Sequence, residues 1–278
     1  MQFNNLLFGT AGVPNSTPKK NNPIEGVRAI HNLGLDCMQL EFAHGVRMKE
    51  EVSSDLRKIS YELGIPLTSH GPYYINLNAR EQDKIDSSVE RIIQTAKISD
   101  LCGAESMTFH AAFYMKDSPY DVFDLVEKSL NVIEERLGRL DIEIELRPEL
   151  TGKTSQFGSL EELISLTKSV NSCSPCMDFS HLFARTGKYN SYEEFSKVLE
   201  NLKLELGAKA LDQMHIHISG ISSNSKGDLK HLNLEDSKFN WKELIKCLKD
   251  NNCKGYVICN SPNLETDALM LKNYYHSL

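Results

Sequence analysis

Most histidines in this chain stand at or just after the end of a short apolar segment. Six of the nine do so: His70, His110, His181, His215, His217 and His231. Carboxylates occupy similar positions, because Glu149 ends an apolar segment, and Asp178 and Asp228 each stand three residues before a histidine. Imidazole combined with carboxylate suits zinc, iron or manganese, whereas calcium and magnesium prefer oxygen ligands. The residue types therefore predict a transition-metal centre.

The candidate ligands outnumber what one tetrahedral ion can use. We therefore expect two or three ions, with zinc as the first choice and manganese or iron as alternatives. A carboxylate such as Glu149 is a natural bridge between two of them. Paired metal ions are typical of enzymes that cleave phosphodiesters, since one ion activates water and another stabilises the leaving oxygen.

Short apolar runs alternate with longer amphipathic runs along the chain, and they predict the elements that position these ligands. The expected strands are residues 6–9, 37–42, 66–70, 106–110, 142–149, 175–179, 213–219 and 255–260. The expected helices are residues 23–32, 50–63, 81–101, 120–137, 159–170, 191–206, 240–250 and 264–276. Helix signals include Leu244, Ile245 and Leu248 at helical spacing, and a capping box formed by Ser159 and Glu162.

Eight strand-then-helix units predict parallel strands joined by right-handed crossovers. An open doubly wound sheet is the competing arrangement, but residues 9–12 match its glycine-rich phosphate turn poorly. We therefore predict an α/β fold in which residues 1–278 form a single (β/α)₈ TIM-barrel domain. The carboxyl ends of barrel strands open onto one mouth, where the ligands should converge. The polar stretch 220–239 is expected to be a long irregular loop.

Two histidines share the seventh expected strand. His215 and His217 point to the same side of that strand, because side chains alternate. We expect one of them to bind metal and the other to be its buried neighbour. Glu41 lies on the second expected strand, and we expect it beside the metal ligands rather than among them.

Composition excludes several classes of protein. With 40% hydrophobic and 25% charged residues, the chain is typical of a soluble globular protein, and no apolar run approaches the roughly 18 residues of a membrane helix. Residues 1–9 lack the basic segment of a secretory signal, so we expect a cytoplasmic monomer with no membrane partner. The net charge of −7 does not favour general nucleic-acid binding, although metal ions would add positive charge at the mouth. We expect a structural role for Cys173 and Cys176, which form a lone C-x-x-C.

Residues 69–77 read Ser-His-Gly-Pro-Tyr-Tyr-Ile-Asn-Leu. This segment resembles the H-x-P-Y-x-I-N-L signature of the endonuclease IV family of apurinic/apyrimidinic endonucleases, and the resemblance spans nearly the whole chain. Further matched positions are His110, Glu149, Asp178, His181 and His217. His217 is a better match than His215, because the polar stretch begins directly after it.

The resemblance implies a barrel that carries three zinc ions and cleaves DNA 5′ to abasic sites in base excision repair, leaving a 3′-hydroxyl. The implied metal ligands are His70, His110, Glu149, Asp178, His181, His217, Asp228 and His231. Glu149 would also be the catalytic residue, as a partial base toward the attacking water. Arg47 and Tyr73 match loop residues that enter the DNA and help to extrude the abasic nucleotide, which costs little to flip. DNA with abasic sites is therefore the expected partner.

One departure from the family pattern lies at the end of the eighth strand. Asn260 stands where the family has a metal-ligating glutamate, and a neutral amide is the poorer ligand. We therefore expect Asn260 beside the metal ligands. Glu235 or Glu265 could supply the missing carboxylate, and nothing in the sequence favours one over the other.

A second departure concerns the ligands after the seventh strand. The family spaces them as D-x-H, whereas residues 228–231 read Asp-Leu-Lys-His. Aligned without a gap, Lys230 takes the place of the ligand histidine. With a shift of one residue, His231 takes it.

Two other functions are compatible with these residues. A xylose-isomerase-like sugar isomerase or epimerase would use a single divalent metal ion. Glu41, Asn260 and the acidic net charge favour it, while the 69–77 segment and the number of histidines disfavour it. A non-catalytic barrel that binds damaged DNA or another ligand is the third possibility.

Overall fold

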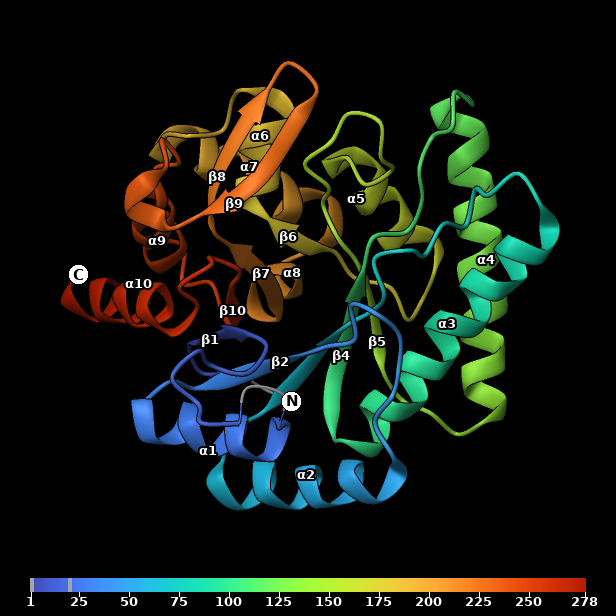
Figure 1. The fold of residues 1–278 in the computed structure, drawn as a ribbon. Helices are drawn as coiled ribbons and strands as arrows, with labels where there is room; N and C mark the ends of the chain where they lie inside the picture. The colour runs from blue at the N-terminus through green and yellow to red at the C-terminus, as the bar shows by residue number, and fades with distance from the viewer. Residues whose placement is uncertain (1–2, 20–21) are drawn as a thin grey trace.

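The computed structural model describes residues 3–19 and 22–278, and eight parallel strands form its central sheet. The strands are β1 (Leu6–Ala11), β2 (Cys37–Glu41), β3 (Leu67–His70), β4 (Ala104–Phe109), β5 (Glu145–Pro148), β6 (Cys176–Asp178), β7 (Met214–Ile218) and β10 (Gly255–Cys259). Their order in the sheet is β5-β4-β3-β2-β1-β10-β7-β6, with helices outside (Figure 1). This arrangement confirms the predicted α/β barrel.

The barrel is nearly closed where β5 meets β6. Parallel bridges join Leu146 to Cys173 and Glu149 to Cys176. The Leu150 N–H also donates to the Cys176 carbonyl oxygen at 2.9 Å. This closure places Glu149, which directly follows β5, against β6 and so on the side of the mouth where the next ligands begin.

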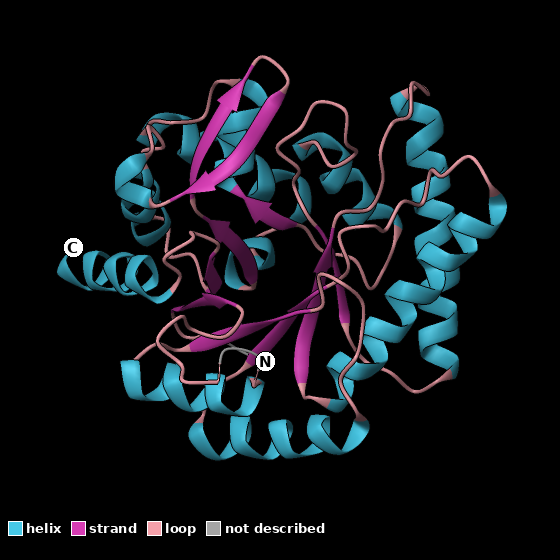
Figure 2. Ribbon diagram, viewed as in Figure 1, coloured by secondary structure: helices cyan, strands magenta, loops and turns pink. Residues whose placement is uncertain are grey.

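Helices connect the strands and cover the outside of the barrel (Figure 2). They are α1 (Pro23–Leu33), α2 (Glu50–Leu63), α3 (Gln82–Leu101), α4 (Pro119–Arg139), α5 (Leu160–Ser169), α6 (Phe179–Thr186), α7 (Tyr192–Leu206), α8 (Lys209–Asp212), α9 (Trp241–Asp250) and α10 (Glu265–Ser277). The predicted spacing is confirmed in α9, where Leu244, Ile245 and Leu248 are buried. The capping box of Ser159 and Glu162 starts α5. None of the described helices is long and apolar enough to cross a membrane.

The short helices α6 and α8 were not expected from the sequence. Helix α6 begins directly after β6, because the Asp178 side chain caps it and accepts the His181 N–H at 2.7 Å. The strand expected at 175–179 therefore ends at Asp178. Asp178 and His181 are thus brought together by a helix cap as well as by the barrel.

The prediction that residues 220–239 form an irregular loop was wrong. Strands β8 (Gly220–Asn224) and β9 (Gly227–Leu232) form an antiparallel hairpin, and a 3₁₀ helix η1 (Leu234–Asp236) follows. The polar composition gave no sign of this hairpin. Gly227, at the hairpin turn, has φ +106°, a conformation that suits glycine. The hairpin, orange in Figure 1, stands beyond β6 and β7. The Asp228 N–H donates to the Gly152 carbonyl oxygen at 3.1 Å and ties the hairpin to the loop after β5.

Candidate metal centre

Four histidines surround the carboxylate of Glu149 at the mouth of the barrel. Nε2 of His70 and Nε2 of His110 lie 3.0 and 3.3 Å from Glu149 Oε2. Nδ1 of His181 and Nδ1 of His217 lie 3.2 and 3.3 Å from Oε1. Glu149 is only 2% exposed. Residues from β3, β7, α6 and the ends of β4 and β5 thus meet around one buried anion.

In three of the histidines at the mouth, a hydrogen bond to a backbone carbonyl determines which ring nitrogen carries the hydrogen. A backbone carbonyl oxygen can only accept, so Nδ1 of His70 must donate to the carbonyl of the next residue at 2.6 Å. Nδ1 of His181 likewise donates to Leu150 at 3.0 Å, and Nδ1 of His231 donates to Asn260 at 3.0 Å. Nε2 of His181 and Nε2 of His231 are thereby left to offer lone pairs, whereas Nε2 of His70 is within hydrogen-bond distance of Glu149 Oε2 at 3.0 Å. Metal-ligating histidines are held in this way.

His181 and His231 face each other through these nitrogens. Their Nε2 atoms lie 3.4 Å apart, so a cation or a shared proton has to lie between the two lone pairs. Asp228 lines the same cavity and adds a carboxylate. Asp178 Oδ2 is buried and receives no hydrogen bond from the part of the chain that the structure describes. These groups fit a metal site, because each offers a lone pair that no protein hydrogen satisfies.

Gln39 holds both histidines of β7, and the partners of their other nitrogens distinguish them. Its Oε1 lies 3.1 Å from Nε2 of His215 and 3.0 Å from Nε2 of His217, and both rings donate to it. The remaining nitrogen of His215 accepts from Ser106 Oγ at 3.1 Å. Nδ1 of His217 lies 3.3 Å from Glu149 Oε1 and 3.2 Å from Asn260 Nδ2, so His217 is the histidine that faces the Glu149 centre and His215 is its buried neighbour. The sequence interpretation missed Gln39, although its place two residues before the end of β2 marks it as facing the same side as the strand-end residue.

The cysteines do not build a second centre. All seven are free and buried. Cys176 offers its sulfur within 4.8 Å of nitrogens of His215 and His217. Both nitrogens of His215 are already engaged by Gln39 and Ser106, so this ring offers no free lone pair to a metal ion.

A β-bulge resolves the spacing of the ligands on β9. The strand pairs Lys230 and Asp228 with consecutive residues of β8, so Leu229 is the extra residue. In a regular strand, side chains three residues apart point to opposite faces. The bulge turns Asp228 and His231 toward the same cavity, while Leu229 is 58% exposed. His231, and not the exposed Lys230, therefore stands with the ligands.

Deleting Leu229 should leave the metal content of the protein unchanged. The deletion removes the bulge and the extra residue together, so Asp228 and His231 stay on one face. Inserting an alanine between Lys230 and His231 should instead turn the histidine away and lose about one ion per chain, because a one-residue slip reverses the face. Elemental analysis of both variants checks this. Metal lost on deletion and kept on insertion would contradict the assignment.

The ligands form one wall of a cavity of about 410 Å³. The other residues that line the cavity are Ala11, Gln39, Glu41, Ala43, Tyr73, Asn260 and Leu264. The cavity lies at the carboxyl ends of the strands, where barrel enzymes carry out their chemistry. Its size falls within the roughly 300–1,000 Å³ of small-ligand sites.

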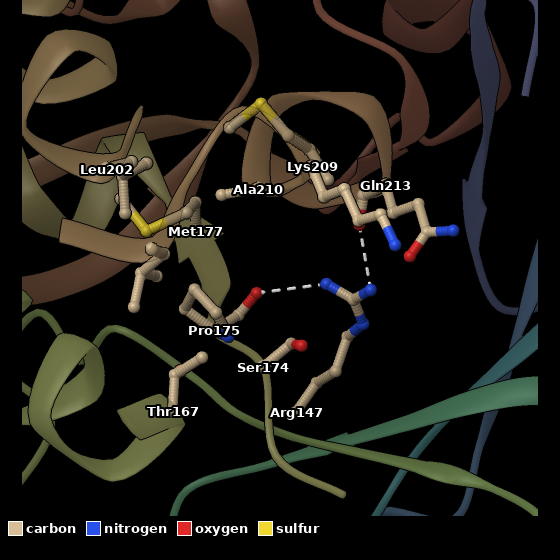
Figure 3. Close-up of a pocket in the computed structure, with 11 residues that line it drawn as sticks. Arg147, Thr167, Ser174, Pro175, Met177, Leu202, Lys209, Ala210 and Gln213 are labelled. Atoms are coloured by element: carbon tan, nitrogen blue, oxygen red, sulfur yellow. Dashed lines mark hydrogen bonds between the residues drawn. The ribbon is translucent and has the colours of Figure 1, made fainter. Parts of the chain in front are cut away.

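A smaller cavity of about 140 Å³ lies near the amino ends of β6 and β7 (Figure 3). Arg147 reaches into it and donates to the carbonyl oxygens of Pro175 and Gln213 at 3.2 and 2.8 Å. The guanidinium also pairs with Glu145. Its charge and donors are therefore engaged, and residues at this end of a barrel serve stability rather than catalysis.

Tyr73 and Arg47, the residues expected to contact DNA, differ in their distance from the centre. Tyr73 is 53% exposed, and its ring lies 5.1 Å from that of His70 and 6.0 Å from that of His110, between centroids. Arg47 is exposed on the loop between β2 and α2. Tyr73 lines the cavity, and Arg47 does not.

The sequence model of the xylose isomerase-like TIM barrel family matches residues 27–274. The chain belongs to this family. An uncharacterized protein of Methanocaldococcus jannaschii is 42% identical over 274 residues, which are 98% of each chain. A probable endonuclease 4 of Aster yellows witches'-broom phytoplasma is 26% identical over 213 residues, which are 75% of this chain and 70% of that protein. The resemblance to endonuclease IV in the sequence is thereby confirmed.

Solved structures of this xylose isomerase-like fold include enzymes of two kinds. Endonuclease IV from Thermus thermophilus superposes with a TM-score of 0.74 and 20% identity, over 97% of this chain and 100% of the other. A D-tagatose 3-epimerase-like protein superposes with a TM-score of 0.69 and 15% identity, over 96% of both chains. At these identities the likeness shows the fold alone, so the choice of reaction depends on the side chains.

In this xylose isomerase-like barrel, Asn260 directly follows β10, the eighth strand of the barrel, so this strand end carries no carboxylate. Its Nδ2 donates to Nδ1 of His217 at 3.2 Å, and its Oδ1 is buried with no hydrogen-bond partner in the described chain. Glu265 does not compensate, because its oxygens accept two backbone N–H groups of the loop after β1, both at 2.8 Å. Glu235 is exposed on η1. Neither glutamate lines the cavity.

Charges in the cluster shift the pKa values of its members. Burial raises the pKa of Glu149, but the neighbouring His217 and His110, with hydrogen bonds from His110 and His181, hold it well below its usual value. Burial lowers the pKa of His181, yet Asp178 and Glu149 outweigh this and raise it to about 9. At neutral pH and without metal, Glu149 is therefore ionised and the His181 ring is protonated on both nitrogens.

Metal binding should displace the proton on His181. A ligand histidine has to be neutral, so the apparent zinc affinity should rise between pH 7 and 9, by about tenfold per pH unit for each proton released. Competition with a chelator of known zinc affinity at pH 7, 8 and 9 measures this. His181→Gln should bind zinc more weakly and with a flatter pH dependence. A wild-type affinity that is constant from pH 7 to 9 would contradict the prediction.

Proposed function

We propose that this protein is a metal-dependent endonuclease that hydrolyses the DNA phosphodiester 5′ to abasic sites in base excision repair, with two or three zinc ions at the barrel mouth. One observation carries the proposal: the buried carboxylate of Glu149 is shared by two adjoining ligand groups. The groups are His70, His110 and Glu149, and Glu149, Asp178 and His217, with ligand atoms within 4.8 Å of one another in each. His181, His231 and Asp228 form a third group beside them.

The donor set suits zinc, because it combines imidazole nitrogens with carboxylates and because His70, His181, His217 and His231 are each oriented by a hydrogen bond to another part of the chain. When bound, the ions would supply an activated water and neutralise charge on the phosphate. Glu149 belongs to both ligand groups and would help to hold the ions of each. Because it is ionised at neutral pH, Glu149 can also accept a hydrogen bond from the attacking water and orient it.

Tyr73 and Arg47 would position the DNA. The half-exposed Tyr73 ring stands between the ligands His70 and His110 and the solvent, where it can pack against an extruded sugar. Arg47 on its exposed loop can reach the phosphate backbone. An abasic nucleotide suits this geometry, since it has no base to unstack.

A duplex oligonucleotide with one tetrahydrofuran abasic analogue tests the proposal. With zinc, manganese or cobalt present, we expect a single cut 5′ to the analogue that leaves a 3′-hydroxyl. An undamaged duplex of the same sequence is the control and should stay intact. Absence of cutting with all three metals would rule out this function.

A second candidate is a sugar isomerase or epimerase that uses one divalent metal ion. It is favoured by the lining of the cavity, where Glu41 and Asn260 offer hydrogen-bonding groups to a polyol. It is also supported by the epimerase-like neighbour of the same fold. Incubation of a panel of ketoses with the manganese-loaded protein distinguishes the two, because the endonuclease should convert none of them.

A further inference from the structure

Glu41 places in the cavity a carboxylate that the metal centre does not use. It ends β2 and stands in register with His70 of β3. Neighbours in register on parallel strands point to the same face, so its side chain enters the mouth and lines the cavity. Among the residues that the structure describes, the groups of close metal ligands do not include it. Its role therefore has to be sought in what the cavity binds.

A buried hydrogen-bond network holds Glu41 in one orientation. Gln39 Oε1 accepts from His215 and His217, which turns the Gln39 amide nitrogen the other way. That nitrogen donates to Glu41 Oε1 at 2.9 Å. His215 is anchored in turn by Ser106 at 3.1 Å. The carboxylate is thus oriented before any ligand arrives, which reduces the entropy lost on binding.

The other oxygen of Glu41 is left for a ligand. Oε2 receives no hydrogen bond from residues 3–19 or 22–278. After burial, the charge of Glu41 is the largest cause that raises the pKa of Tyr73, so the carboxylate acts on the rim of the same cavity. An anion at this position repels phosphate and accepts hydrogen bonds from hydroxyl groups. The cavity therefore sorts a substrate, with the phosphate toward the candidate metal ligands and a hydroxyl toward Glu41.

The chemistry of DNA leaves one candidate hydroxyl. Within an intact strand the 3′ and 5′ oxygens are esterified, and the 2′ carbon bears only hydrogen. A nucleotide that keeps its base has no free hydroxyl on its sugar. An abasic residue has one, the hemiacetal hydroxyl at C1′.

We propose that Glu41 Oε2 accepts a hydrogen bond from the C1′ hydroxyl of the abasic sugar and so makes the protein select true abasic sites. This inference rests on the proposed endonuclease function. A site built to bond a hydroxyl discriminates against an analogue that lacks it. The tetrahydrofuran analogue is such a compound, because it carries hydrogen at C1′.

Wild-type protein and Glu41→Gln should be compared on two duplexes that differ only in the lesion, a natural abasic site made by removing uracil and the tetrahydrofuran analogue. Only the 3′-hydroxyl product is counted, because spontaneous elimination leaves a different end. We expect the wild-type kcat/KM to be about tenfold or more higher on the natural site, as for a bond to a charged group. In Glu41→Gln the two values should become nearly equal, with cutting of the analogue and zinc content retained.

Glu235→Gln is the matched control, because it neutralises an exposed glutamate outside the cavity and should keep the wild-type preference. Glu41→Asp, which withdraws the carboxylate by one methylene, should also lose preference and provides a second test. Equal wild-type rates on both duplexes, an unchanged preference in Glu41→Gln, or loss of zinc from that variant would overturn the inference while leaving the endonuclease in place. Failure of the wild-type protein to cut either duplex would overturn both.

Discussion

Replacing Glu149 with glutamine should nearly abolish DNA cutting and remove bound metal. The amide keeps the shape of the side chain but loses the charge that two ligand groups share. The loss of kcat/KM should exceed the roughly 10- to 100-fold effect of removing a partner behind a metal ligand, and we expect at least about a thousandfold. Zinc content, measured by elemental analysis, should fall by at least one ion per chain.

The variant should also change the histidines in the metal-free protein. Glu149 lies within 3.3 Å of His110 and His217, and its charge helps to raise the pKa of His217 and His181. Without that charge, these two histidines should titrate at lower pH, which NMR of the imidazole protons measures. Glu235→Gln, remote from the cavity, should behave as the wild type. A Glu149→Gln protein with normal zinc content and normal cutting would exclude the shared-carboxylate centre.

Removing the metal should both stop DNA cutting and lower the melting temperature. An ion present at about a hundred times its dissociation constant stabilises the folded chain by about 2.7 kcal/mol. For a chain of this size each kcal/mol corresponds to roughly 2–4 °C, so the loss of one such ion should lower Tm by roughly 5–10 °C. The buried Asp178 and the facing His181 and His231 are the groups left without their partner. Calorimetry before and after chelation measures the shift.

Zinc added back after chelation should restore both properties, and this reversal separates metal loss from damage by the chelator. Asp228→Asn should show a smaller metal-dependent shift than the wild type, because the third ligand group has lost its charge. Unchanged Tm and undetectable cutting at every metal concentration would instead support the non-catalytic barrel. Elemental analysis of the chelated protein is needed to interpret either result.

Local signals in the sequence were sufficient for the barrel and for the expectation that most of the candidate ligands lie at its mouth. Helical spacing such as that of Leu244 and Leu248, and the capping box at Ser159, depend only on neighbours along the chain. Once the alternation of strands and helices indicates a barrel, the carboxyl end of each strand has to lie at one mouth. His70 and Glu149 could therefore be placed together without any knowledge of packing.

Tertiary structure decided what depends on pairing between distant segments. Whether His231 or Lys230 enters the cavity depends on a bulge, which exists only because β9 pairs with β8. His217 was preferred over His215 on a sequence argument, but the physical difference is that Ser106 engages Nδ1 of His215 while Nδ1 of His217 faces Glu149, with the Gln39 amide of another strand holding both rings. The same amide orients Glu41. A strand sequence shows which side chains share a face, but hydrogen bonds across the barrel determine which lone pairs remain free for a metal ion or a substrate.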